Sequence, residues 1–301
     1  MPDTFRFFTE RTCYYMKKNY RAELTGVFGD PVDGNPTGVM EEAGYEALNL
    51  NYRYITMQVR AEDLEAAFLG AKAVNMRGVN LTMPHKITII PYLDQLSEAA
   101  RIIGAVNTVI NNNGTWIGEN TDGKGFVLAL KDKGVSPEGK TVTILGAGGA
   151  ARAIAVECAL AGAQKILIIN RNEGRGRELA ELIASQTGTD SEYLPWTPGM
   201  EIPAETQILI QGTSIGLHPN VEQKPDINYE SITENMIACD VVFNPVMPLF
   251  LREAQSRGAQ IITGIGMLVR QGALNFEFWT GMPAPVDVMY QTLENEFRAV
   301  D

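Results

Sequence analysis

A glycine-rich segment near the middle of the chain constrains its fold more than any other feature. β-prone residues 141–145 lead into Gly146-Ala-Gly-Gly-Ala150, and an alanine-rich, helix-prone run continues to Gly162. A strand, a tight turn and a helix in this order are the context in which a Gly-x-Gly-x-x-Gly/Ala pattern binds a dinucleotide. Gly146 can turn the chain sharply, Gly148 lets a pyrophosphate approach the backbone, and the helix start directs free N–H groups at the phosphates. The segment therefore predicts a Rossmann-type parallel sheet with a bound dinucleotide.

The next strand, residues 165–170, indicates which dinucleotide binds. No acidic residue ends this strand, and the chain continues as Asn170-Arg171-Asn172-Glu173-Gly174-Arg175. Two arginines suit a ribose 2′-phosphate because guanidinium groups pair bidentately with phosphate. We therefore favour NADP, although Glu173 suits a free 2′-hydroxyl and keeps NAD as the alternative. A second alternative is that Arg171 and Arg175 lie on a solvated helix start without a ligand.

Length and composition indicate a globular α/β protein of two domains. The chain has 301 residues, of which 45% are hydrophobic and 20% charged, and its formal net charge is −11. This charge argues against a nucleic-acid or anionic membrane partner. Three scattered cysteines and two histidines predict no metal site and suit the reducing cytoplasm. We find no apolar run of about 18 residues and no signal peptide. Residues 1–20 are interpreted as a helical N-terminal extension.

The first third of the chain alternates predicted strands and helices. The strand at residues 23–29 ends in a loop rich in turn formers, where Asn35 and Thr37 are candidates for gripping a small ligand. The alternative is a plain connector. A strand over residues 78–82 stops at Pro84, from which we predict one helix to about residue 102 with Lys86 at its start.

Further strands and loops follow from the same kind of pattern. We predict a strand at residues 104–110 and, after a turn at 111–114, a hairpin partner at 115–118. Residues 119–125 form a polar, glycine-punctuated stretch that predicts a loop before a helix at 126–132. Residues 186–201 also indicate a loop.

The order and spacing of several short motifs resemble the shikimate/quinate dehydrogenase family. Lys86 taken alone is most simply a solvated lysine, and Asp122 alone a helix cap. The matching segments, which span the chain from about Leu24 to its C-terminus, are Asn80-Leu-Thr-Met-Pro-His-Lys86, Gly104-Ala-Val-Asn107-Thr, Asn120-Thr-Asp122-Gly, Gly146-Ala-Gly-Gly-Ala150, Asn170-Arg171, Asp240-Val-Val-Phe-Asn-Pro245 and Gly264-Ile-Gly-Met-Leu-Val-Arg-Gln271.

This resemblance implies an architecture and a reaction. It implies an N-terminal α/β substrate-binding domain, residues 1–124 and 273–301, and a Rossmann-type NAD(P)-binding domain, residues 125–272. The reaction implied is reversible hydride transfer between NADP and a cyclic polyol carboxylate, such as reduction of 3-dehydroshikimate to shikimate in aromatic amino-acid biosynthesis. The protein would be a cytoplasmic monomer or homodimer.

The resemblance also assigns roles to individual residues. Lys86 and Asp122 match the catalytic pair, with the amine accepting the hydroxyl proton in oxidation and its ammonium form donating it in reduction. The implied substrate-binding residues are Asn35, Thr37, Thr82, Asn107 and Gln271. The implied cofactor-binding residues are Gly146, Ala147, Gly148, Gly149, Ala150, Asn170, Arg171, Arg175, Val241 and Gly264.

Three departures from the family pattern concern substrate recognition. The loop that normally reads His-Ser-x-Ser-Pro is Gly34-Asn35-Pro36-Thr37-Gly38, a usual His-Asn pair is Glu41-Glu42, and Phe243 replaces a tyrosine. Asn35 and Thr37 retain an amide and a hydroxyl that can hold a carboxylate. Thr37 and Glu173 keep open a quinate-type or diverged polyol dehydrogenase that uses NAD. A non-catalytic dinucleotide-binding sensor is the alternative of a different class.

Overall fold

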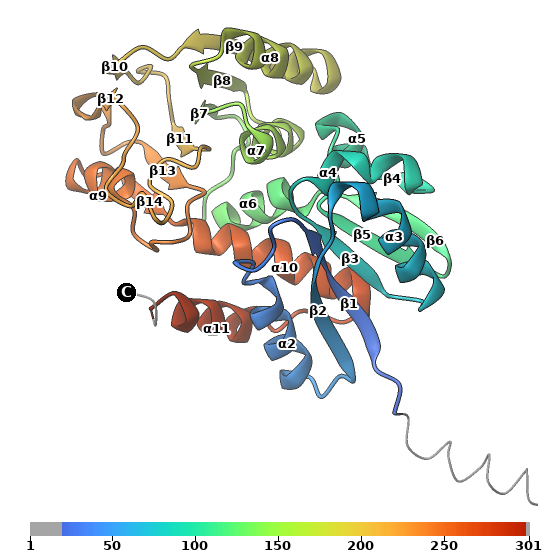
Figure 1. Ribbon diagram of the computed structural model, residues 1–301. Helices are drawn as coiled ribbons and strands as arrows, with labels where there is room; N and C mark the ends of the chain where they lie inside the picture. The colour runs from blue at the N-terminus through green and yellow to red at the C-terminus, as the bar shows by residue number, and fades with distance from the viewer. Residues whose placement is uncertain (1–19, 299–301) are drawn as a thin grey trace, which may run out of the picture.

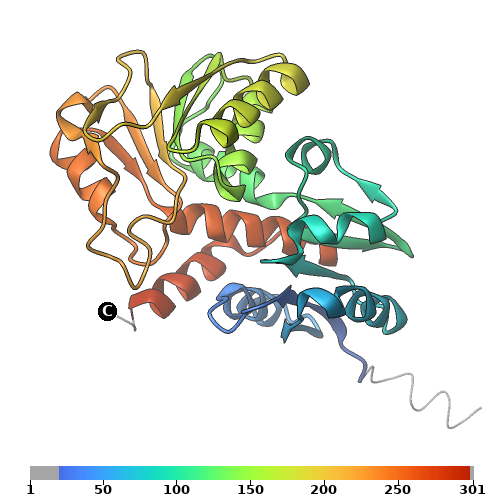
Figure 2. The same cartoon turned by 45° about the horizontal axis from the view of Figure 1, so that its top comes forward.

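The computed structural model of the protein describes residues 20–298 and contains two six-stranded sheets in two lobes (Figures 1 and 2). The helical extension predicted over residues 1–20 lies outside the described residues, except for Tyr20. Within the described part of the chain, no helix has the length and apolarity needed to span a bilayer.

The first lobe comprises the sheet of order β2-β1-β3-β5-β6-β4 and its helices. Its elements are β1 (Glu23–Gly29), α2 (Thr37–Ala47), β2 (Tyr52–Gln58), η1 (Ala61–Asp63), α3 (Leu64–Ala73), β3 (Gly78–Leu81), α4 (His85–Thr88), η2 (Ile90–Tyr92), β4 (Gln95–Leu96), α5 (Glu98–Ile103), β5 (Thr108–Asn112) and β6 (Thr115–Glu119). Strands β2, β1 and β3 run parallel, whereas β5 is antiparallel to both β3 and β6. The predicted β5–β6 hairpin is confirmed.

The second lobe comprises an all-parallel sheet of order β14-β13-β11-β7-β8-β9, which confirms the Rossmann-type prediction. Its elements are α6 (Thr121–Asp132), β7 (Thr141–Leu145), α7 (Gly149–Leu160), β8 (Lys165–Asn170), α8 (Glu173–Thr187), β9 (Asp190–Pro195), β10 (Met200–Glu201), β11 (Ile208–Gln211), β12 (Ile227–Asn228), η3 (Tyr229–Ser231), β13 (Ile237–Asp240), α9 (Leu249–Ser256) and β14 (Gln260–Ile262). Strand β7 is completely buried, as expected for a strand covered by helices on both faces.

Helix α10 (Gly264–Thr280) joins the two lobes, and α11 (Val286–Arg298) follows it (Figure 1). The N-terminal end of α10 lies against the segment that follows β13, because a side-chain carbon at Gly264 would lie 2.4 Å from the Val242 carbonyl oxygen. Its C-terminal end reaches the first sheet, where the Trp279 indole N–H donates to the Val109 carbonyl at 3.1 Å. Phe276 stacks on Tyr45 there, with ring centroids 5.2 Å apart. One rigid helix therefore contacts both cores.

The predicted single helix from Pro84 to residue 102 is wrong. The segment contains α4, η2, the short strand β4 and α5. Pro91 has no backbone N–H and cannot continue an α-helix, and the Ser97 hydroxyl caps a new helix by accepting from the Ala100 N–H at 3.1 Å. The following strand also begins later than predicted, at Thr108, because Gly104 ends α5 with a φ of +73°.

The predicted loop at residues 119–125 is also wrong, because α6 begins at Thr121. Two glycines in α6 allow this helix to pack closely against α7 and α10. A side-chain carbon at Gly123 would lie 2.3 Å from the Ala153 carbonyl of α7, and one at Gly125 would lie 2.7 Å from the Gln271 nitrogen of α10. Residues 186–201 contain the end of α8 and the strands β9 and β10, so the loop predicted there is wrong as well.

The domain limits inferred from the sequence fall within helices. The limit after residue 124 lies in α6, and the limit after residue 272 lies in α10. We retain the division into residues 1–124 with 273–301 and residues 125–272 as a proposal, with these two helices shared at the boundary.

The packing of α7 against α6 buries Glu157 and makes the stability of the fold sensitive to pH. Burial raises the pKa of Glu157 to about 7, while Lys124 opposes and Glu119 adds to the shift. The unfolded chain ionises this group near 4.5, so its contribution to stability is complete below that pH and is lost as the pH rises through about 7. In the wild-type protein we expect the free energy of unfolding to fall by an amount on the order of 2 kcal/mol over this pH range, and in Glu157→Gln we expect this fall to be absent.

Denaturant unfolding between pH 4.5 and 8 measures this effect. The exposed Glu181→Gln on α8 is the matched control and should follow the wild-type pH dependence. An unchanged pH dependence in Glu157→Gln would show that the carboxyl does not titrate in this range.

Candidate active site

A cavity of about 680 Å³ lies between the two lobes and brings together most of the residues singled out by sequence. The predicted residues that line it are Thr82, Lys86, Asp122, Gly146, Ala147, Gly148, Gly149, Ala150, Asn170, Val241, Gly264 and Gln271. The sequence analysis missed Met83, Thr213, Ser214, Met267 and Leu268, which also line the cavity. One end is therefore the glycine turn, and the other is the lysine–carboxylate pair.

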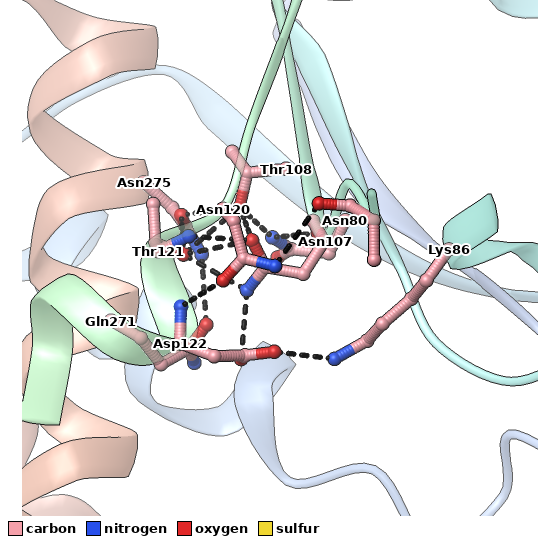
Figure 3. A network of polar contacts seen from close by, with 10 residues as sticks. Asn80, Lys86, Asn107, Thr108, Asn120, Thr121, Asp122, Gln271 and Asn275 are labelled. Carbon is pink, nitrogen blue, oxygen red and sulfur yellow. Dashed lines mark hydrogen bonds and ion pairs between the residues drawn. The ribbon is translucent and has the colours of Figure 1, made fainter. Parts of the chain in front are cut away.

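Lys86 and Asp122 meet directly in this cavity (Figure 3). The Lys86 Nζ lies 2.6 Å from Oδ2 of Asp122, and the two side chains are 34% and 18% exposed. Lys86 comes from the short helix α4 after β3, and Asp122 from the first turn of α6. An ammonium group and a carboxylate, both reachable from the cavity, can exchange a proton with a ligand and orient it.

A hydrogen bond from the Asn107 side chain holds the other carboxylate oxygen of Asp122, Oδ1. The Asn107 side-chain NH₂ donates to Asp122 Oδ1 at 2.9 Å, and the Asn107 side-chain oxygen, Oδ1, accepts the Thr121 backbone N–H at 2.7 Å. Asn107 is 3% exposed and does not line the cavity. Its position therefore suits it to orienting the carboxylate. Direct contact with the ligand, as predicted from the sequence, stays a prediction.

A buried polar network extends from Asn107 away from the Lys86–Asp122 pair (Figure 3). Asn275 of α10 accepts from the hydroxyls of Thr108 at 2.8 Å and Thr121 at 3.0 Å. Asn80 of β3 donates to Thr108 at 3.1 Å and accepts from the Tyr54 hydroxyl at 2.8 Å. The network was not predicted as a unit. Asn80 and Thr121 lie in motifs quoted above, whereas Asn275 has no sequence signal beyond its place one turn after Gln271.

The glycine turn fits a dinucleotide pyrophosphate. Gly146 has a φ of +113°, and a side-chain carbon there would lie 2.8 Å from Thr213, so only glycine suits this position. Side-chain carbons at Gly148 and Gly149 would meet nothing within 4 Å, which leaves the backbone open to an approaching ligand. Helix α7 begins at Gly149 without a side-chain cap, so its first N–H groups are available to an anion.

The two candidate arginines are placed differently. Arg171 lines an adjoining cavity of about 770 Å³ together with Trp196 and Ser214, and its guanidinium lies 6.0 Å from the Trp196 ring centroid. Ser214 also lines the interdomain cavity, so the two spaces are neighbours. Arg175 is exposed in the first turn of α8 and lines neither cavity. Its backbone N–H donates to Asn172 Oδ1 at 3.0 Å.

Asn35 and Thr37 lie at the N-terminus of α2 and outside the lining of the cavity. Asn35 Oδ1 accepts the Thr37 backbone N–H at 3.0 Å. The loop that carries Asn35 nevertheless packs beside a cavity residue, because a side-chain carbon at Gly29 would touch both Thr82, at 2.2 Å, and Val32, at 3.2 Å. In the described residues, no group of three or more histidine, cysteine, aspartate or glutamate side chains suits a metal ion.

Three family models match successive parts of the chain. They describe the shikimate dehydrogenase substrate-binding domain, residues 27–109, shikimate/quinate 5-dehydrogenase, residues 128–243, and the shikimate 5′-dehydrogenase C-terminal domain, residues 264–294. A shikimate dehydrogenase (NADP⁺) from Desulforamulus reducens is 43% identical over 281 residues, which cover 92% of this chain and 97% of that protein.

The similar solved structures include shikimate dehydrogenases and also a reductase that is named for another substrate. A 5-ketofructose reductase from Gluconobacter sp. strain CHM43 is 46% identical to this chain and superposes with a TM-score of 0.90. The match covers 93% of this chain and 100% of the reductase chain. A shikimate 5-dehydrogenase from Listeria monocytogenes, in complex with shikimate and NAD, is 34% identical with a TM-score of 0.86, and covers 92% and 99%. Proteins similar to this chain are therefore named for two substrates, shikimate and 5-ketofructose.

The buried network predicts that Asn275 contributes to stability as well as to site geometry. Asn275→Leu removes an acceptor of two buried hydroxyls and leaves both to share the Asn107 side-chain oxygen, at 3.1 and 3.3 Å. Each buried hydrogen bond lost costs about 1 kcal/mol. We therefore expect the free energy of unfolding to fall by about 2 kcal/mol in denaturant titrations. Gln291→Leu, an exposed amide on α11, is the matched control and should change stability by less than about 0.5 kcal/mol. Equal stability of the two variants would contradict a role for the network.

Proposed function

Because the chain belongs to the shikimate/quinate 5-dehydrogenase family, we propose that it is an NADP-linked shikimate 5-dehydrogenase that reversibly reduces 3-dehydroshikimate to shikimate in aromatic amino-acid biosynthesis. It is an NAD(P)-dependent oxidoreductase that acts on a CH–OH group. The observation that carries the proposal is the contact of Lys86 with Asp122 in a cavity that also contains the glycine turn.

In the proposed reaction, separate residues transfer the proton, orient the proton donor and bind the polyol. When bound, the nicotinamide supplies or accepts the hydride. The Lys86 ammonium donates a proton to the ketone oxygen as that oxygen becomes a hydroxyl, and in the oxidative direction the amine removes it. Asp122 lies 2.6 Å from the lysine, so it orients the ammonium group and can accept a hydrogen bond from the same hydroxyl. Thr82 and Gln271 line the cavity and offer further donors and acceptors to a polyol.

NADP is supported by the surroundings of Arg171. The guanidinium lies beside Trp196 in the cavity that adjoins the interdomain cavity at Ser214, where the adenosine end of the cofactor would be held. Glu173, which in sequence suited a free 2′-hydroxyl and NAD, is instead paired with Arg177 at 2.7 Å. Its carboxylate is thereby engaged within α8, which weakens the case for NAD.

Reduction of a neutral polyol ketone is the second candidate function. Asn35 and Thr37 replace the serine pair of the family at the loop before α2, and the similar Gluconobacter protein is a 5-ketofructose reductase. A quinate-type activity, on a ring that carries a carboxylate, would use the same hydride and proton transfer. The non-catalytic sensor is disfavoured, because a protein that only binds dinucleotide has no use for the Lys86–Asp122 contact.

We further propose a cytoplasmic monomer or homodimer whose partners are small molecules. Among the described cysteines, Cys158 and Cys239 are free and buried, which suits a reducing compartment. The net charge of −11 disfavours nucleic acid as a partner.

Steady-state assays with 3-dehydroshikimate, shikimate, quinate and 5-ketofructose, each with NADP(H) and NAD(H), test the proposed function. We expect NADPH-dependent reduction of 3-dehydroshikimate, and we expect Lys86→Ala to lower kcat by about 10²–10⁴-fold because the proton donor is lost. Lys131→Ala, an exposed lysine on α6, is the control and should retain the wild-type rate. The absence of turnover with shikimate and its ketone would refute the first candidate.

Arg171→Ala tests the cofactor assignment. We expect the dissociation constant for NADP⁺ to rise by about ten-fold or more, because a charge-assisted contact to phosphate is lost, while binding of NAD⁺ changes little. Titration calorimetry with both cofactors measures this difference. Arg101→Ala, an exposed arginine on α5, should leave both constants unchanged. Equal weakening of the two cofactors in Arg171→Ala would contradict a phosphate contact.

A further inference from the structure

The cavity that adjoins the interdomain cavity contains an aromatic ring, Trp196, to which the proposed reaction gives no role. Trp196 lies next to Arg171 because their strands are neighbours: β8 and β9 run parallel, with Asn170 opposite Pro195 in the register. Each of the two residues directly follows the end of its strand. Ligands of open parallel sheets bind outside the carboxyl ends of the strands. Arg171 and Trp196 therefore leave the sheet side by side at the edge where a dinucleotide would bind.

The Trp196 side chain is held in the wall of this cavity. Its backbone N–H donates to the Asn170 carbonyl at 3.3 Å, and its indole N–H donates to the Asp226 carbonyl at 2.9 Å. The residue is half-buried and packs against an apolar cluster that includes Leu209 and Ile227. These contacts fix both ends of the residue, and the ring lines the cavity together with Arg171.

The Arg171 guanidinium lies close to this ring and carries its charge without a counterion. It is 6.0 Å from the Trp196 ring centroid, at the outer limit of a cation–π contact. Two acids, Glu222 and Asp226, line the same cavity. Within residues 20–298, neither these acids nor any other carboxylate forms an ion pair with Arg171.

Two other cations of the second lobe are paired with carboxylates. Lys224 lines the same cavity but is paired with Glu253. Arg177, in the second turn of α8, is paired with Glu173 at 2.7 Å. Arg171 therefore differs from both, because its nearest charged-group contact in the described chain is with an indole ring.

An indole ring and a carboxylate hold an arginine with different consequences. A carboxylate competes with a phosphate for the guanidinium N–H groups, whereas a ring face leaves these donors free. Ordering a long side chain before the ligand arrives also reduces the entropy lost on binding. We propose that Trp196 is a positioning residue that holds the Arg171 guanidinium toward the ribose 2′-phosphate of NADP and thereby increases the preference for NADP over NAD. This proposal rests on the proposed NADP-linked function and adds a residue that acts through Arg171.

Removal of the ring should weaken the binding of NADP⁺ selectively. We expect Trp196→Leu to raise the dissociation constant for NADP⁺ by about three- to five-fold and to leave that for NAD⁺ unchanged, because NAD⁺ lacks the 2′-phosphate. Titration calorimetry with both cofactors measures the two constants. Trp196→Phe keeps a ring face and should retain the wild-type preference for NADP⁺. Phe278→Leu, at an exposed aromatic residue on α10, is the matched control and should change neither constant.

The double variant shows whether Trp196 acts through Arg171. In the Arg171→Ala background, Trp196→Leu should have no further effect on NADP⁺ binding, because no guanidinium remains to be held. A further loss there would overturn the proposal. So would an unchanged constant for NADP⁺ in Trp196→Leu, or equal weakening of both cofactors, which would place the ring against the adenosine that they share.

The smaller substitution decides the case in which Trp196→Leu does not fold, as judged by circular dichroism. A preference for NADP⁺ that is retained in Trp196→Phe supports the proposal, and a lost preference overturns it. Failure of the wild-type protein to bind either cofactor would count against the proposed function instead.

Discussion

The geometry of the site depends on the side chain of Asn107. One buried amide both accepts the Thr121 N–H and donates to Asp122, so it fixes the start of α6 and the direction of the carboxylate at the same time. The lysine is then positioned by a 2.6 Å contact with the other carboxylate oxygen. Hydrogen bonds in a buried network polarise one another and tolerate little displacement, which keeps the pair in one arrangement.

Close helix packing brings this arrangement to the cofactor turn. Gly123 and Gly125 allow α6 to approach α7 and α10 so closely that a methyl group at either position would overlap backbone atoms. Helix α7 begins at the glycine turn, and α10 carries Gln271 and Asn275. The three helices therefore connect the phosphate end of the cavity to its proton-transfer end through backbone contacts.

The sequence predicted those parts of the molecule that rest on local patterns. The strand–turn–helix predicted around Gly146 is present, because strand β7 ends at Leu145 and helix α7 begins at Gly149. The loop predicted at residues 119–125 failed because its glycines serve packing partners far away in the chain, which a local pattern does not reveal. Glu157 and Asn275 were missed for the same reason: each acquires its role from burial against another helix. Arg171 and Arg175 looked equivalent in sequence, yet only Arg171 faces a cavity.

The residues proposed for proton transfer and those proposed for substrate recognition belong to different parts of the fold. Lys86, Asp122 and Asn107 are held by bonds among α4, β5, α6 and α10, whereas Asn35 and Thr37 belong to α2 and the loop before it. In the part of the chain that the structure describes, Tyr54 lies between the two sets: its backbone N–H donates to Glu42 of α2, and its hydroxyl donates to Asn80. A change in α2 therefore leaves the hydrogen bonds that hold the Lys86–Asp122 pair unchanged. One scaffold carries both shikimate dehydrogenases and a 5-ketofructose reductase at similar levels of identity to this chain, so the fold alone does not determine the substrate.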